Sequence, residues 1–327
     1  MAVIVVHVSA GSTYDVYTTD WVILNCFASC LSWEIPIFVM ISGRFFLAPQ
    51  KTITPQIMIR KYIKRLMIAF ITWSAALQIY YILCGLNTLN WKGIFIEFAI
   101  GRYPYWYLWM LMGLYLITPF LRMIATDKKT MEMYIVLSFI FNAIVKIGPY
   151  IPGFGSAITA VLSESEFHFV LGFSGYFLLG YYLHEYPLPD RIERSLYIAL
   201  PILLVFACVG TTLQSRAIGE NEDFFSTYLM PNVTLEAVAI YTFFTKRVAK
   251  IDFTSRLRNF FSKGAEYSFG IYLVHPIVNN IVGRVGLTST FTTPFVAVPV
   301  ATIVVCLICI LIVYVIRKIP CIGKMIT

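Results

Sequence analysis

Charged side chains are scarce in this sequence. Only 13% of its 327 residues are Asp, Glu, Lys or Arg, whereas 59% are hydrophobic, and the mean hydropathy is +0.76. A soluble domain carries about 25% charged residues, so this composition excludes an ordinary soluble protein. The chain also has no P-loop, no H-E-x-x-H and no G-x-S-x-G sequence. ATP-driven transport and the common hydrolase mechanisms therefore have no support.

The cysteines do not predict a disulfide framework or a metal site. Cys26 and Cys30 lie about one helical turn apart inside an apolar run, as do Cys306 and Cys309. A C-x-x-C sequence can indicate metal or redox chemistry. Here no His or acidic residue accompanies the pair, so we interpret these cysteines as small, polarizable packing residues.

Long apolar runs recur from one end of the chain to the other. A transmembrane helix needs about 20 mostly apolar residues, and only a helical bundle satisfies the backbone polar groups of such continuous runs. We therefore predict an all-α, polytopic transmembrane bundle of about ten helices that forms a single domain, residues 1–327. The predicted spans are 21–47, 62–84, 105–124, 131–147, 168–184, 196–213, 228–245, 265–285 and 291–316, preceded by residues 1–8. Residues 1–8 are too short to span, which predicts a truncated first helix.

The basic residues alternate between the two ends of the predicted helices. All but five of the 25 Lys and Arg residues lie on one face, and the opposite face carries acidic loops with Glu164, Glu166, Glu220, Glu222 and Asp223. By the positive-inside rule the basic face is cytoplasmic, which puts both termini inside the cell. The excess positive charge is then a signal of topology, and it does not indicate nucleic-acid binding. On the opposite face, aromatic and apolar residues between Gly85 and Pro104 predict an interfacial helix.

Four ionisable residues fall inside the predicted spans: His7, Glu34, Glu236 and His275. Ionisable groups in a bilayer are costly, and each is a functional candidate. An imidazole has the unperturbed pKa best suited to proton transfer near neutral pH, so His7 could deprotonate a hydroxyl that approaches from outside. The two glutamates could equally be buried structural partners of neighbouring side chains. His275 could hold a helix kink beside Pro276 or line a substrate site.

Basic residues cluster at the start of one span, in the segment Arg60–Arg65. Their spacing puts several cations on one helix face. Such a cluster commonly contacts anionic lipid head groups, and it could also bind the phosphates of a nucleotide-containing donor.

Five segments, in order along nearly the whole chain, carry a resemblance to a known family. They are 36–43 (PIFVMISG), 61–66 (KYIKRL), 106–119 (WYLW and GLYLITP), 175–182 (GYFLLGYY) and 267–276 (YSFGIYLVHP). The ordered set resembles the membrane acyltransferase-3 superfamily, and His7 falls where that family has its first-helix histidine.

The resemblance implies a bacterial inner-membrane enzyme that moves acyl groups, usually acetyl, from cytoplasmic acyl-CoA to hydroxyls of lipid-linked or surface glycans. It implies that His7 is the catalytic base. Apart from the resemblance, Glu34 and Glu236 are weaker candidates to orient its imidazole. The implied partners are membrane lipids and a carbohydrate acceptor, with acetyl-CoA or another acyl-CoA as the donor substrate and no bound cofactor. The implied donor-phosphate residues are Lys61, Lys64 and Arg65, and the expected substrate-lining residues are Ser42, Trp109, Tyr272 and His275.

The sequence departs from the family pattern at one place. The family has an arginine eleven residues before its histidine, which would fall upstream of Met1. The main alternative to an acyltransferase is a transporter of a glycan or a small acid, because intramembrane Glu and His residues also suit proton coupling. A non-catalytic membrane scaffold is the third hypothesis.

Overall fold

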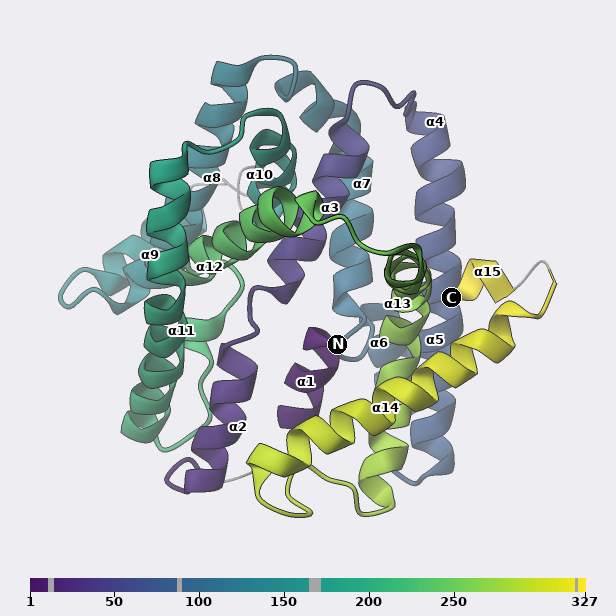
Figure 1. The fold of residues 1–327 in the computed structure, drawn as a ribbon. Helices are drawn as coiled ribbons and strands as arrows, with labels where there is room; N and C mark the ends of the chain where they lie inside the picture. The colour runs from purple at the N-terminus through teal and green to yellow at the C-terminus, as the bar shows by residue number, and fades with distance from the viewer. Residues whose placement is uncertain (11–14, 87–89, 165–171, 321–322) are drawn as a thin grey trace.

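The computed structural model describes residues 1–10, 15–86, 90–164, 172–320 and 323–327, and within these ranges the chain is helical and contains no strand (Figure 1). The predicted all-α fold class is therefore confirmed. Its α-helices are α1 (Ala2–Ser9), α2 (Thr19–Ser29), α3 (Glu34–Leu47), α4 (Pro55–Ile57), α5 (Lys64–Leu83), α6 (Trp91–Ile100), α7 (Trp106–Ile124), α8 (Lys128–Ile147), α9 (Gly155–Glu164), α10 (Ser174–Glu185), α11 (Asp190–Ile218), α12 (Pro231–Thr242), α13 (Ser255–Arg284), α14 (Pro294–Arg317) and α15 (Gly323–Ile326). A π-helical turn joins α4 to α5, and another follows α12.

Six helical segments in the described residues are long and apolar enough to cross a membrane. They are Thr19–Leu47, Pro55–Leu83, Trp106–Ile124, Lys128–Tyr150, Asp190–Ile218 and Pro294–Arg317. The predicted number of about ten helices agrees roughly with this architecture, but the prediction of nine full spans does not. Helices α10 and α12 have only 12 residues each, and the start of the predicted span 168–184 lies outside the described residues.

The predicted span 21–47 is broken into α2 and α3. Pro36 has no N–H to donate to the carbonyl of Ser32, and its ring would clash with that carbonyl in a regular helix. The chain makes tight i→i+3 hydrogen bonds here instead, including one from Glu34 N to Leu31 O of 3.0 Å. The break therefore places Glu34 in the first turn of α3, in the interior of the bundle.

Helices α3 and α10 approach each other more closely than ordinary side chains allow. A Cβ built on Gly43 would lie 1.7 Å from the carbonyl oxygen of Phe177, and one on Gly180 would lie 2.0 Å from that of Met40. Small residues that allow such close backbone contact are typical of helix pairs in membranes. This contact fixes the position of α3, which carries Glu34 and Ser42.

Helix α1 lies inside the bundle, where it contacts α2, α13 and α14. In contrast, α11 presents an apolar outer face with exposed Ile198, Ile202, Val205 and Leu213. Apolar side chains exposed along a whole helix suit a lipid environment. The predicted helix between Gly85 and Pro104 is present as α6, whose first turn is capped by the Asn90 side chain accepting from Gly93 N at 2.9 Å.

Candidate functional site

Two large cavities enter the bundle and approach each other at a narrow constriction. The first, of about 900 Å³, has Asp223 at its edge, and we call it the Asp223 cavity. The second, of about 540 Å³, contains Arg65, and we call it the Arg65 cavity. Between them lies a space of about 10 Å³ lined by His7, which we call the His7 constriction. The constriction shares Val3, Ile35, Tyr107 and Tyr272 with the Arg65 cavity, and Glu34, Tyr103, Trp106 and Tyr228 with the Asp223 cavity.

Three segments of the chain pass from one cavity to the other at this constriction. On α1, Ile4 lines the Arg65 cavity and Val6 lines the Asp223 cavity, with His7 at the boundary. Along α2 and α3, the residues up to Glu34 line the Asp223 cavity, and those from Ile35 to Ser42 line the Arg65 cavity. At the start of α7, Trp106 lines the Asp223 cavity, whereas Tyr107 and Leu111 line the Arg65 cavity. The two cavities therefore enter from opposite ends of the helices, and His7 lies where they meet.

His7 lies beside a second histidine. Its ring centroid is 4.5 Å from that of Tyr103 and 4.8 Å from that of His275. His275 is fully buried, and its Nδ1 lies 2.6 Å from the carbonyl oxygen of Tyr272. A carbonyl can only accept, so Nδ1 carries the hydrogen. Nε2 of His275 is then a free acceptor, and it has no hydrogen-bond partner in the described structure.

Pro276 explains why the Tyr272 carbonyl is available. In a regular helix this carbonyl would accept from the N–H of residue 276, which proline lacks. The His275 imidazole supplies the missing hydrogen bond. The His-Pro pair therefore satisfies the backbone of α13 and fixes the histidine tautomer in one step.

The loop before α7 is tied to α13 by two tyrosine hydroxyls. Tyr272 Oη donates to the carbonyl of Pro104 at 2.7 Å, and Tyr105 Oη donates to that of Leu273 at 2.6 Å. These hydrogen bonds hold Tyr103 and Tyr107 at the constriction. Buried tyrosines with satisfied hydroxyls are rigid wall elements.

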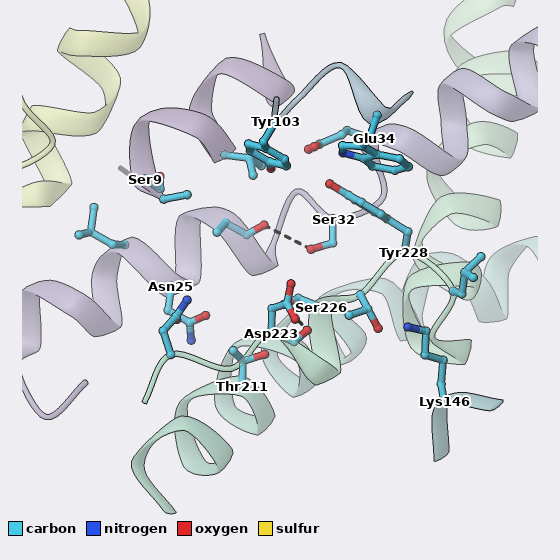
Figure 2. A pocket seen from close by; sticks show the side chains of 18 of the residues that line it. Ser9, Asn25, Ser32, Glu34, Tyr103, Lys146, Thr211, Asp223, Ser226 and Tyr228 are labelled. Atoms are coloured by element: carbon cyan, nitrogen blue, oxygen red, sulfur yellow. Dashed lines mark hydrogen bonds between the residues drawn. The ribbon is translucent and has the colours of Figure 1, made fainter. Parts of the chain in front are cut away.

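The Asp223 cavity has aromatic walls and an acidic side. The rings of Trp106 and Tyr228 are stacked, with centroids 5.8 Å apart and planes at 27°. Figure 2 shows Glu34, Tyr103 and Tyr228 grouped at one end of this cavity, with Asp223 and other polar side chains towards the other end. Glu34 is only 3% exposed, and its Oε2 has no hydrogen-bond partner in the described structure.

The three basic residues expected to bind the donor phosphates differ in their position relative to the Arg65 cavity. Arg65 lines the Arg65 cavity, donates to the Thr327 carbonyl at 2.9 Å and lies over the Phe269 ring. Lys61 and Lys64 are exposed and are not among the residues that line this cavity. Only one of the three predicted donor-phosphate residues is therefore positioned at a cavity.

Comparison with known families decides the identity of the chain. The family model described as an acyltransferase domain, Acyl_transf_3, matches residues 1–314. The chain belongs to the acyltransferase-3 family. No curated protein and no solved structure matches it. It is thus a multi-pass membrane acyltransferase, and the site described above is its candidate active site.

The other predicted site residues of this acyltransferase are divided between the cavities and other places. Ser42 lines the Arg65 cavity together with Tyr272 and His275. Trp109 does not line any of the three cavities, because its indole Nε1 donates to Ala99 O at 3.0 Å and its ring packs on Phe70. The expectation that Trp109 lines the substrate site is therefore corrected.

Glu236 also lies away from these cavities. It is fully buried on α12, where its Oε1 accepts from Asn232 on the same helix at 3.3 Å. It lines neither the His7 constriction nor the two cavities. Of the two glutamates considered as candidates to orient His7, only Glu34 lines the His7 constriction.

Sequence reasoning missed Tyr103, Tyr107, Tyr228 and Asp223 as site residues of the acyltransferase. One signal was available: residues 103–107 read Tyr-Pro-Tyr-Trp-Tyr, a denser aromatic group than a membrane boundary requires. Tyr228 and Asp223 belong to the connection before α12, and no spacing in the sequence links them to His7. In the described part of the chain, no group of three His, Cys, Asp or Glu side chains is arranged to hold a metal ion.

Proposed function

We propose that this acyltransferase is an inner-membrane O-acyltransferase that moves an acyl group, such as acetyl, from acyl-CoA to a hydroxyl of a lipid-linked or cell-surface glycan. One observation carries the proposal: two cavities from opposite ends of the bundle meet at His7. A donor and an acceptor can then reach one histidine from opposite sides. By the positive-inside rule, the Arg65 cavity opens to the cytoplasm, where acyl-CoA is available, and both termini are cytoplasmic.

The Arg65 cavity suits the donor. Its volume lies within the usual range for ligand pockets, about 300–1,000 Å³, and most of its lining is apolar. A guanidinium binds phosphate through charge-assisted, bidentate hydrogen bonds, so Arg65 would hold a CoA phosphate while the acyl end reaches towards Tyr272 and His275. Lys61 and Lys64, being exposed, would contribute to attraction of the donor or to lipid contact.

The reaction would be completed at the His7 constriction. The acceptor hydroxyl enters through the Asp223 cavity, and His7 takes its proton as the oxygen attacks the thioester carbonyl. The new C–O bond forms, the C–S bond breaks, and the proton passes from His7 to the departing CoA sulfur. The free Nε2 of His275 would accept the N–H of the His7 ring and so hold its other nitrogen as the base. Glu34 is the carboxylate near enough to act on the acceptor.

The first test is binding of acetyl-CoA to the purified protein in detergent. Hydrogen bonds to charged groups contribute about 1.5–3 kcal/mol, so we expect Arg65→Gln to weaken binding about tenfold or more. Lys64→Gln removes a charge from the same helix end without touching the cavity, and we expect it to change the affinity by no more than about twofold. The melting temperature of both variants controls for the contact between Arg65 and Thr327.

A second variant separates binding from chemistry. His7→Ala should bind acetyl-CoA but transfer no acyl group, because the base is lost while the Arg65 cavity remains. If the wild-type protein shows no acyl-CoA binding, or if His7→Ala transfers acyl groups normally, the enzyme proposal fails. Absence of donor binding would favour the transporter hypothesis.

A further inference from the structure

The Asp223 cavity carries more negative charge than a neutral sugar requires. Among the described residues that line it, the ionisable ones apart from the tyrosines are Glu34, Glu220, Asp223 and one cation, Lys146. None of these four takes part in an ion pair recorded among the described residues. The three carboxyl groups therefore have one lysine among them to balance their charge.

Glu34 is the decisive member of this set. Its side chain is only 3% exposed, the residue lines the cavity, and its buried Oε2 has no hydrogen-bond partner in the described structure. Burying an unpartnered carboxyl group is costly. The cost is offset if a ligand supplies a cation or a donor at this point.

The walls around Glu34 are those of a cation site. The Trp106 and Tyr228 rings are stacked, and the Phe173 ring lies 6.1 Å from Trp106 and 6.3 Å from Tyr228. Tyr103 lines both the cavity and the constriction beside Glu34. Aromatic faces attract ammonium groups, and they do so more strongly when the site is desolvated. Aromatic rings alone would suit any sugar, but together with a buried unpaired acid they suit a sugar that carries a positive charge.

From this combination we infer that the acceptor carries a protonated amine, as an amino sugar does, and that Glu34 pairs with this ammonium while the acceptor hydroxyl faces His7. The inference rests on the proposed function, because it names the class of the acceptor. Asp223 and Glu220 line the same cavity and would attract the cation on entry. An acidic sugar would face three carboxyl groups and is disfavoured.

The test uses three methyl β-glycosides of similar shape and different charge: glucosaminide, glucoside and glucuronide. Their dissociation constants are measured by ligand-observed NMR on the purified protein in detergent, at a pH where the amine is protonated. We expect the glucosaminide to bind about tenfold more tightly than the glucoside, and the glucuronide to bind least.

Two variants identify the cause of this preference. Glu34→Gln keeps the shape and hydrogen bonding of the side chain but not its charge, so we expect the preference for the glucosaminide to fall to about twofold or less. Glu222→Gln is the matched control, because this acid belongs to the same connection as Asp223 but is not among the cavity residues, and it should leave the preference unchanged.

The outcomes that overturn the inference are specific. Equal binding of glucosaminide and glucoside, tighter binding of the glucuronide, no binding of any glycoside, or an unchanged preference in Glu34→Gln would each refute it. The proposed acyltransferase reaction is judged separately, by acetyl-CoA binding in the Arg65 cavity. Donor binding without amine preference would leave the enzyme proposal intact and remove only the amino-sugar acceptor.

Discussion

The contact between α3 and α10 gives the sharpest structural prediction. Adding a methyl group at Gly43 would place a carbon 1.7 Å from the carbonyl oxygen of Phe177. An ordinary contact needs about 3.5 Å, so the two helices would have to separate locally by roughly 2 Å. The obstacle is backbone, so no side-chain rotation can relieve it.

We therefore expect Gly43→Ala to destabilise the fold substantially. Overpacking of a well-packed core typically costs about 1–3 kcal/mol, and a clash with backbone should reach at least the upper end, about 3 kcal/mol. Gly180→Ala meets the Met40 carbonyl across the same interface and should behave alike. The assay is thermal unfolding in detergent, combined with size-exclusion chromatography to detect the fraction that remains folded.

The matched control is Gly113→Ala, on α7. A Cβ at this position meets no atom within 4 Å, and alanine is about 1 kcal/mol more favourable than glycine within a helix. Gly113→Ala should therefore have wild-type or slightly higher stability. If Gly43→Ala proved as stable as Gly113→Ala, the close approach of α3 and α10 would be wrong, together with the placement of Glu34 and Ser42 that depends on it.

Three further predictions concern buried polar groups, and each is read by thermal unfolding. Glu193 is fully buried and pairs with the partly exposed Lys246 at 2.8 Å and with Arg247 at 3.0 Å. Glu193→Gln removes the charge from these hydrogen bonds and should destabilise the protein by about 1.5 kcal/mol; an unchanged melting temperature would contradict this pairing. Arg122 donates to the Phe46 carbonyl at 2.6 Å at the end of α3, so Arg122→Gln should destabilise by about 1.5–3 kcal/mol, whereas no change would mean that water satisfies that carbonyl. Asn142 both donates to and accepts from the backbone of Gly172; Asn142→Ala should cost about 2 kcal/mol, and a neutral result would argue against this link.

The fold class and much of the helix pattern could be predicted from the sequence, because runs of apolar residues leave helices as the only way to satisfy backbone groups in lipid. Helix α6 was predicted from a different signal, the aromatic and apolar residues between Gly85 and Pro104 that are typical of an interfacial helix. The short α10 and α12 were not predicted as short. For α12, the apolar run continues past Thr242 into the π-helical turn Phe243–Arg247, and hydropathy does not distinguish these two kinds of helix.

The sequence could predict how deep the candidate site residues lie along their helices. It could not predict the direction in which their side chains point. Counting along a helix gives the height of Glu34 and Glu236 in the bundle, but it does not give the side to which each side chain points. Glu34 points into the constriction because Pro36 breaks the preceding span, whereas Glu236 is held by Asn232 on its own helix. The nearness of His7 and His275 could not be predicted either, since it depends on the packing of α1 against α13.

Two prolines next to the site, Pro36 and Pro276, each make the backbone locally irregular. Pro36 breaks the helix before Glu34, and Pro276 frees the carbonyl that fixes the tautomer of His275. Irregular backbone within a membrane is tolerated only where protein buries it or where it lines a cavity. Both irregularities lie at the His7 constriction or beside it. These prolines thus account for the position of Glu34 in the first turn of α3 and for the contact of His275 Nδ1 with the Tyr272 carbonyl.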